Sequence, residues 1–156
     1  MSGATVLFLT VRVLHVLLAA IWLGCTAFIV FFLMPARAKA GTAEAPMMGA
    51  MTRPVNAFMN AVGGITVVAG FWLYWHLTGG FQPELSRTMA ARVFGTGGLA
   101  GLIAIIIGGA VVGRSWKKME DPAPSDAARR RVTTWALVML VLQIIALVLM
   151  AIGHYV

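Results

Sequence analysis

The sequence predicts an all-α integral membrane protein in which four transmembrane helices form an up-down bundle. Hydrophobic residues make up 60% of the 156 residues and charged residues only 11%, a balance unlike that of soluble domains. The chain also divides into four apolar runs long enough to cross about 30 Å of hydrocarbon at about 1.5 Å per residue. These runs comprise residues 6–34, 56–78, 93–113 and 132–155, so residues 1–156 are expected to form a single membrane domain.

The first run, residues 6–34, is predicted to be a transmembrane helix rather than a cleaved signal peptide. It has no basic residue before it, and it is about twice as long as the apolar region of a signal peptide. Residues 36–41 nevertheless imitate a small-residue cleavage site. Pro35 follows this run and Pro54 precedes the second run, so both prolines are taken as marks of helix ends on one side of the membrane.

The basic residues predict the orientation in the membrane, because loops rich in Lys and Arg remain cytoplasmic. Three of the 12 basic residues, Arg12, Arg87 and Arg92, lie on the side of the termini. We therefore expect a protein of a bacterial inner membrane with its N- and C-termini in the periplasm. The net charge of +7 is explained by this asymmetry and by anionic lipids, without any nucleic acid. The other nine basic residues are Arg37, Lys39, Arg53, Arg114, Lys117, Lys118, Arg129, Arg130 and Arg131.

All three histidines, His15, His76 and His154, are predicted to lie at one height near the periplasmic side. Each is about 20 to 23 residues, or roughly 30 to 35 Å, from the cytoplasmic end of its run. Arg12 and Arg92 fall at about the same height by the same count.

The spacing along the first run predicts which side chains face the interior. Arg12, His15 and Trp22 share one helical stripe, and a charged group that faced lipid would cost several kcal/mol. On the third run, Gly97 and Gly101 share a face that permits close approach. Together these residues predict a site inside the bundle.

This combination of residues predicts a b-type haem. Such a haem takes imidazole ligands from facing helices, glycine lets the macrocycle pass near the backbone, and arginine pairs with the propionates. The preferred ligand pair is His15 with His76, and the alternative is His15 with His154. Arg12 or Arg92 would bind the propionates. The sequence contains no C-x-x-C-H motif, which excludes covalent c-type attachment.

The string "HVLLAAIWLG" from His15 to Gly24 resembles the first helix of the copper-resistance D family and of the HemJ-type protoporphyrinogen oxidases. Those families place a histidine early in a helix ahead of a W-x-G element. The resemblance implies that His15 is a haem ligand, as in the oxidases, or a metal ligand, as in the copper proteins. The chain departs from the oxidase pattern because the next arginine, Arg37, comes only after Pro35. The oxidoreductase activity that the resemblance implies therefore stays open.

Two further functions remain open from the residues themselves. Copper binds thioethers and imidazoles, and Met47 and Met51 would share one face of a helix, although at the opposite end of the membrane from the histidines. A structural or accessory subunit of a larger membrane complex is the third function class, because short loops leave almost no domain outside the membrane to recognise a substrate. A redox partner and a homo-oligomer also stay open. A proton-coupled carrier is disfavoured because all five acidic residues lie in the connections.

Overall fold

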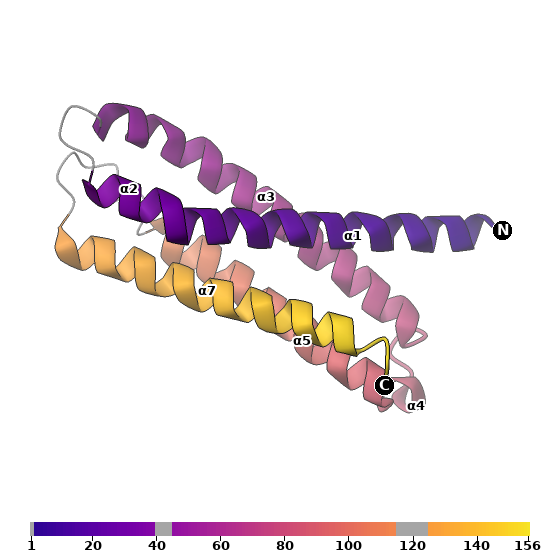
Figure 1. Ribbon diagram of the computed structural model, residues 1–156. Helices are drawn as coiled ribbons and strands as arrows, with labels where there is room; N and C mark the ends of the chain where they lie inside the picture. The colour runs from indigo at the N-terminus through magenta and orange to yellow at the C-terminus, as the bar shows by residue number, and fades with distance from the viewer. Residues whose placement is uncertain (1, 40–44, 115–124) are drawn as a thin grey trace.

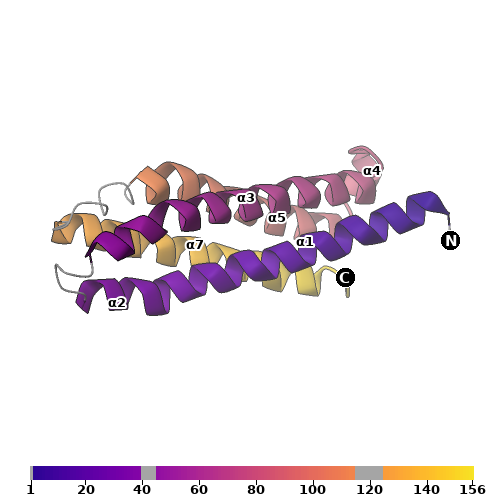
Figure 2. The ribbon, with the colours of Figure 1, turned by 90° about the horizontal axis from the view of Figure 1, so that it is seen from above.

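The computed structural model describes residues 2–39, 45–114 and 125–156. Within these ranges the chain is all-α, and four helices are long and apolar enough to cross a membrane. This confirms the predicted bundle of four candidate transmembrane helices, which run side by side in Figures 1 and 2. The four candidate spans are Gly3–Ala36, Pro54–Leu77, Met89–Val112 and Ala127–Ile152.

Each span is built from one or more helical elements. The first contains α1 (Gly3–Phe28), the π-helical segment η1 (Ile29–Leu33) and the start of α2 (Met34–Lys39). The second lies within α3 (Ala45–Leu77), and the short α4 (Pro83–Ser86) follows it. The third comprises α5 (Met89–Ile107) and a second π-helical segment, η2 (Gly108–Val112), and the fourth lies within α7 (Asp126–Ile152).

Three of the helices begin at hydroxyl caps that the sequence supplies. The side chain of Ser2 accepts a hydrogen bond from the backbone N–H of Thr5 at the start of α1. Thr88 and Ser125 cap α5 and α7 in the same way. Each cap satisfies one of the backbone N–H groups that the first turn of a helix leaves without a partner.

Two helical segments extend further than predicted, because neither Pro35 nor Pro54 ends one. Pro54 lies inside α3, and the chain continues through Pro35 into α2. Proline has no N–H to donate to the preceding turn. Just before Pro35 the ladder changes register, since the N–H of Met34 bonds to the carbonyl of Ile29, five residues back. The segment η1 thus carries the helix past the proline.

Helix α1 packs mainly on α3, and α5 packs mainly on α7, with α3 and α5 joining the two pairs. Figure 1 shows α3 crossing α1, and the first turns of α1 project beyond the ends of the other helices. The core is apolar and runs along the bundle axis. Its buried members include Trp22, Ile29, Met34, Met59, Val62, Ala104, Val112, Val132 and Met139.

Candidate functional site

His15 is the predicted site residue that is held most firmly. Its Nδ1 lies 2.9 Å from the carbonyl oxygen of Thr66 on α3. Because a carbonyl only accepts, Nδ1 carries the proton and donates it. Nε2 forms no hydrogen bond with any residue that the structure describes. In a neutral ring, Nε2 is therefore the nitrogen with a free lone pair.

Two residues of α3 that the sequence analysis did not single out shape this imidazole site. Thr66 is 6% exposed, and its own hydroxyl donates to the carbonyl of Val62 at 2.8 Å. A Cβ atom at Gly70 would lie 2.8 Å from Cε1 of His15, so only glycine lets the ring lie against α3. The backbone carbonyl of Thr66 and the absence of a side chain at Gly70 together fix the orientation of the His15 ring.

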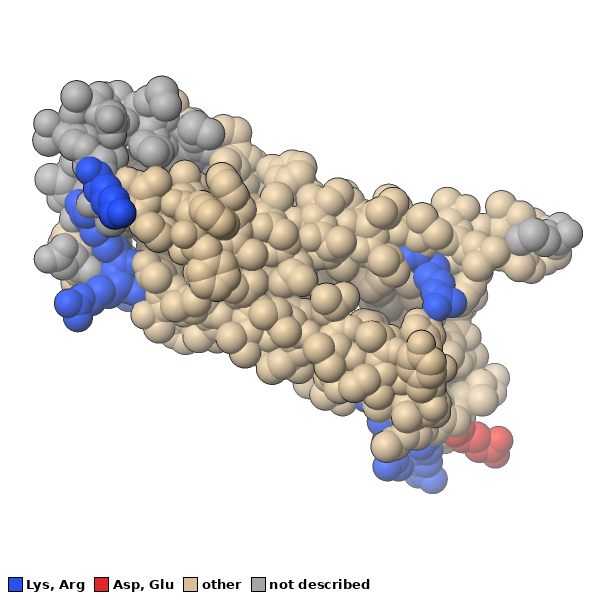
Figure 3. Space-filling view, viewed as in Figure 1, with Lys and Arg blue, Asp and Glu red and all other residues tan. Residues whose placement is uncertain are grey.

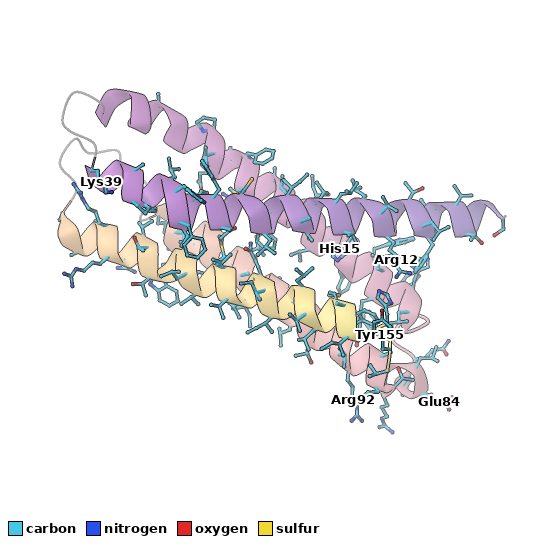
Figure 4. All side chains as sticks on the ribbon, viewed as in Figure 1. Arg12, His15, Lys39, Glu84, Arg92 and Tyr155 are labelled. Atoms are coloured by element: carbon cyan, nitrogen blue, oxygen red, sulfur yellow. The ribbon has the colours of Figure 1, made fainter. Side chains whose placement is uncertain are left out.

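Arg12, which lies one turn before His15 on α1, contacts His154. The Arg12 guanidinium donates to Nε2 of His154 across 2.9 Å and lies 3.5 Å from its Nδ1. Figure 4 shows Arg12 extending from α1 toward the C-terminal end of the chain. The ring of His154 also contacts Phe94 on α5 at a centroid distance of 5.2 Å. Arg12 and His15 lie three residues apart on one face of α1, so this contact brings the residues that follow α7 toward the end of the bundle where His15 lies.

His76 lies apart from His15. Its ring makes a tilted contact with Trp72 at a centroid distance of 3.8 Å and lies 6.3 Å from the ring of Phe8. Phe8 precedes His15 by two turns, or about 10 Å. His76 is exposed, and its Nδ1 donates to the Trp72 carbonyl at 3.2 Å. The structure therefore does not bring the preferred pair, His15 and His76, together.

Trp22 and Gly97 lie at contacts between helices, whereas Gly101 does not. Trp22 is buried against α3, where a Cβ at Gly63 would lie 2.7 Å from its ring. Gly97 faces α7, and a Cβ there would lie 3.4 Å from the carbonyl oxygen of Ala146. A Cβ at Gly101 would meet nothing within 4 Å. Of these three residues, Trp22 lies on the same stripe of α1 as His15.

The charged side chains gather at the two ends of the molecule, with a long uncharged surface between them (Figure 3). Arg92 is exposed near α4 and Glu84 at the end of the bundle where Arg12 also lies (Figure 4). The predicted copper ligands Met47 and Met51 lie in α3, but their side chains fall outside the description. Among the described residues, no group of three His, Cys, Asp or Glu side chains is placed to hold a metal ion.

Gln143 is a polar residue of the interior that lies within the last apolar run. It is 5% exposed, and neither its amide nitrogen nor its amide oxygen has a hydrogen-bond partner among the described residues. Polar groups buried without a partner cost about 1 to 3 kcal/mol each. As the only glutamine within the four predicted apolar runs, Gln143 carried a signal in the sequence.

The contacts of residues before and after Gln143 on α7 show where Gln143 lies along the bundle axis. The Met139 sulfur, one turn before Gln143, lies 3.0 Å from the position of a Cβ at Gly108. The carbonyl oxygen of Ala146, about one turn after Gln143, contacts the position of a Cβ at Gly97. Gln143 therefore lies opposite the middle of α5.

The middle of α5 is also at the height of the His15 site. Ile105 Cδ1 lies 3.0 Å from the Cβ position of Gly63 on α3. Thr66, whose carbonyl accepts from His15, follows Gly63 by about one turn. Gln143 and His15 are consequently within about a turn of each other along the bundle axis.

Comparisons of the chain with known protein families, with curated proteins and with solved structures find no match.

Proposed function

We propose that this chain is a membrane-embedded b-type haem protein that acts in electron transfer or redox chemistry, with His15 as an iron ligand. One observation carries the proposal: Nδ1–H of His15 donates to the Thr66 carbonyl and leaves Nε2 free. Histidines that ligate metals almost always donate their other ring N–H to a carbonyl or carboxylate, which fixes the tautomer and the ring orientation. The haem iron would supply the one-electron chemistry.

His154 is the second ligand in this proposal, because the geometry supports it better than His76. His154 contacts Arg12, which lies one turn of α1 from His15, whereas His76 packs on Trp72 and lies near Phe8, two turns of α1 from His15. Arg12 would then exchange its contact with His154 for a propionate, which is a stronger charge-assisted partner. Arg12 is exposed at the end of the bundle, where propionates reach water.

The proposed location is a bacterial inner membrane, with both termini and the haem near the periplasmic face. The asymmetry of basic residues supports this orientation. The resemblance of "HVLLAAIWLG" to the copper-resistance D and HemJ-type families supports a ligand role for His15. A haem-dependent oxidoreductase activity and a redox partner in a larger membrane complex would follow from the same site.

Absorption spectroscopy of the purified protein tests the proposal. Protein from haem-replete cells should show a Soret band and, after reduction, a sharp α band. His15→Ala and His154→Ala should each weaken or abolish these bands, because each removes an axial imidazole. The matched control is His76→Ala, which removes an exposed histidine and should leave the spectrum unchanged.

Four results would contradict the proposal. A colourless preparation, or bands that persist in His15→Ala protein with unchanged helix content, would rule out His15 as a haem ligand. A loss of haem in His76→Ala would restore the pair His15 and His76 that the spacing favoured. Copper bound in place of haem, measured by metal analysis and removed by His15→Ala, would favour the copper function.

A further inference from the structure

A partly open cavity of about 40 Å³ lies between the helices, on the far side of Trp22 from His15. All four membrane-spanning segments contribute to its wall. Its polar lining residues are Thr26, Asn56 and Asn60, and most of the remaining wall is aliphatic or thioether. The cavity does not include His15, Arg12 or His154, so it is separate from the proposed haem site.

Both π-helical segments border this cavity. Ile29, the first residue of η1, and Gly108 and Val112, the two ends of η2, are part of its wall. A π-helical turn holds an extra residue and locally disturbs regular packing, and such segments occur frequently at functional sites. Two helices thus depart from regular α geometry at the same cavity.

The polar groups beside the cavity are largely engaged within their own helices. The Thr26 hydroxyl donates to the Trp22 carbonyl at 2.9 Å. The side-chain nitrogen of Asn60 donates to the Asn56 carbonyl at 2.9 Å and contacts Asn56 Oδ1 at 3.3 Å. A buried water needs about two to four polar partners, whereas apolar cavities stay dry and take up apolar guests such as xenon. Asn60 Oδ1 and Asn56 Nδ2 have no hydrogen-bond partner among the described residues, but most of the wall is apolar and favours an apolar guest.

We infer that this cavity binds a small apolar gas molecule, of which dioxygen is the natural representative. A water molecule needs roughly 10 to 15 Å³ of such space, so 40 Å³ exceeds one water and suits a diatomic molecule. Apolar gases leave water for hydrocarbon, so the bilayer around the bundle supplies them at a raised concentration. The inference is independent of the haem proposal, because none of His15, His154 and Arg12 lines the cavity.

Xenon is a suitable stand-in for the gas, and methionine methyl groups report where it binds. Met59 and Met139 line the cavity, whereas Met89 is 62% exposed on the surface. In protein labelled with ¹³C at the methionine methyls, the Met59 and Met139 signals should shift with xenon pressure and reach saturation. The Met89 signal should shift only in proportion to the pressure, as xenon dissolves in the detergent.

Two alanines provide a matched pair of variants. Ala136 is 2% exposed and lines the cavity, so Ala136→Val should fill it and remove the saturable shift. Ala110 is exposed on η2, so Ala110→Val should leave the shift intact. Val112→Ala enlarges the cavity, so saturation should occur at lower xenon pressure, which gives a second readout if Ala136→Val does not fold.

The inference fails if Met59 and Met139 respond to xenon no differently from Met89. It also fails if Ala136→Val, folded, leaves the saturable shift unchanged, or if folded Val112→Ala does not lower the pressure at saturation. None of these results bears on the haem spectrum, so the two proposals stand or fall separately.

Discussion

The backbone carbonyl of Thr66 determines which nitrogen of His15 is available to a ligand. It accepts the Nδ1 proton across 2.9 Å, so Nε2 carries the lone pair of the neutral ring. Gly70 completes the arrangement because it has no side chain to push the ring away. The position of the His15 ring therefore depends on the backbone carbonyl of Thr66 and on the absence of a side chain at Gly70.

Replacing Gly70 should displace the His15 ring. In Gly70→Ala the new Cβ would lie 2.8 Å from Cε1 of His15, and such overpacking costs about 1 to 3 kcal/mol. Loss of the orienting hydrogen bond should also weaken haem binding by about 10- to 100-fold. Haem titration and detergent unfolding measure the two effects. Gly24→Ala is the control, since a Cβ there meets nothing within 4 Å, and equal behaviour of the two variants would contradict the prediction.

Replacing Gln143 should stabilise the protein. Gln143→Met keeps the side-chain size and removes an amide whose two polar atoms have no described partner, which should raise the free energy of unfolding by about 1 to 3 kcal/mol. The measurement is the unfolding midpoint in detergent. Gln82→Met changes an exposed glutamine and should have little effect. Destabilisation by Gln143→Met would mean that the amide has a bound partner.

At the scale of the helices, the contact between α1 and α3 depends on Gly63. A Cβ there would lie 2.7 Å from the ring of Trp22, while a Cβ at the neighbouring Gly64 would meet only Ile105, at 3.9 Å. Gly63→Ala should therefore cost about 1 to 3 kcal/mol of stability, and Gly64→Ala much less. Unfolding in detergent measures the cost, and tryptophan fluorescence reports the shift of the ring. Similar costs for both variants would show that α1 and α3 do not pack as described.

The sequence was enough to predict the four helices but not their relative heights. The four apolar runs predicted the spans because length and hydropathy are local properties. The heights were counted from Pro35 and Pro54 as if both ended helices in one plane, yet both lie within helical segments. His15 and His76 consequently differ in height, and α3 crosses α1 at an angle that no local pattern encodes (Figure 1).

The residues that complete the site could not be found from the sequence for a related reason. The parts played by Thr66 and Gly70 become visible only when α3 is placed beside α1. The contact of Arg12 with His154 joins positions 142 residues apart. Gln143 did carry a local signal, as did Asn56 and Asn60, because an amide in an apolar run is costly.

At the scale of the whole molecule, the orientation in the membrane can be measured with cysteines. In a Cys25→Ala background, Ser2→Cys should react with a membrane-impermeant maleimide in intact cells, because the N-terminus is expected in the periplasm. Ser125→Cys, at the start of α7, should react only after the cells are broken. The reverse labelling pattern would place the basic loops outside and overturn the proposed orientation.

The length of the first span has a consequence for how the protein sits among lipids. Gly3–Ala36 holds 34 residues, or about 50 Å of helix against about 30 Å of hydrocarbon. Such hydrophobic mismatch is relieved by tilting the helix or by thickening the bilayer around it. Arg12 and His15 lie on the half of α1 that leads to the projecting first turns. Membrane thickness therefore sets how deeply this end of the bundle is immersed.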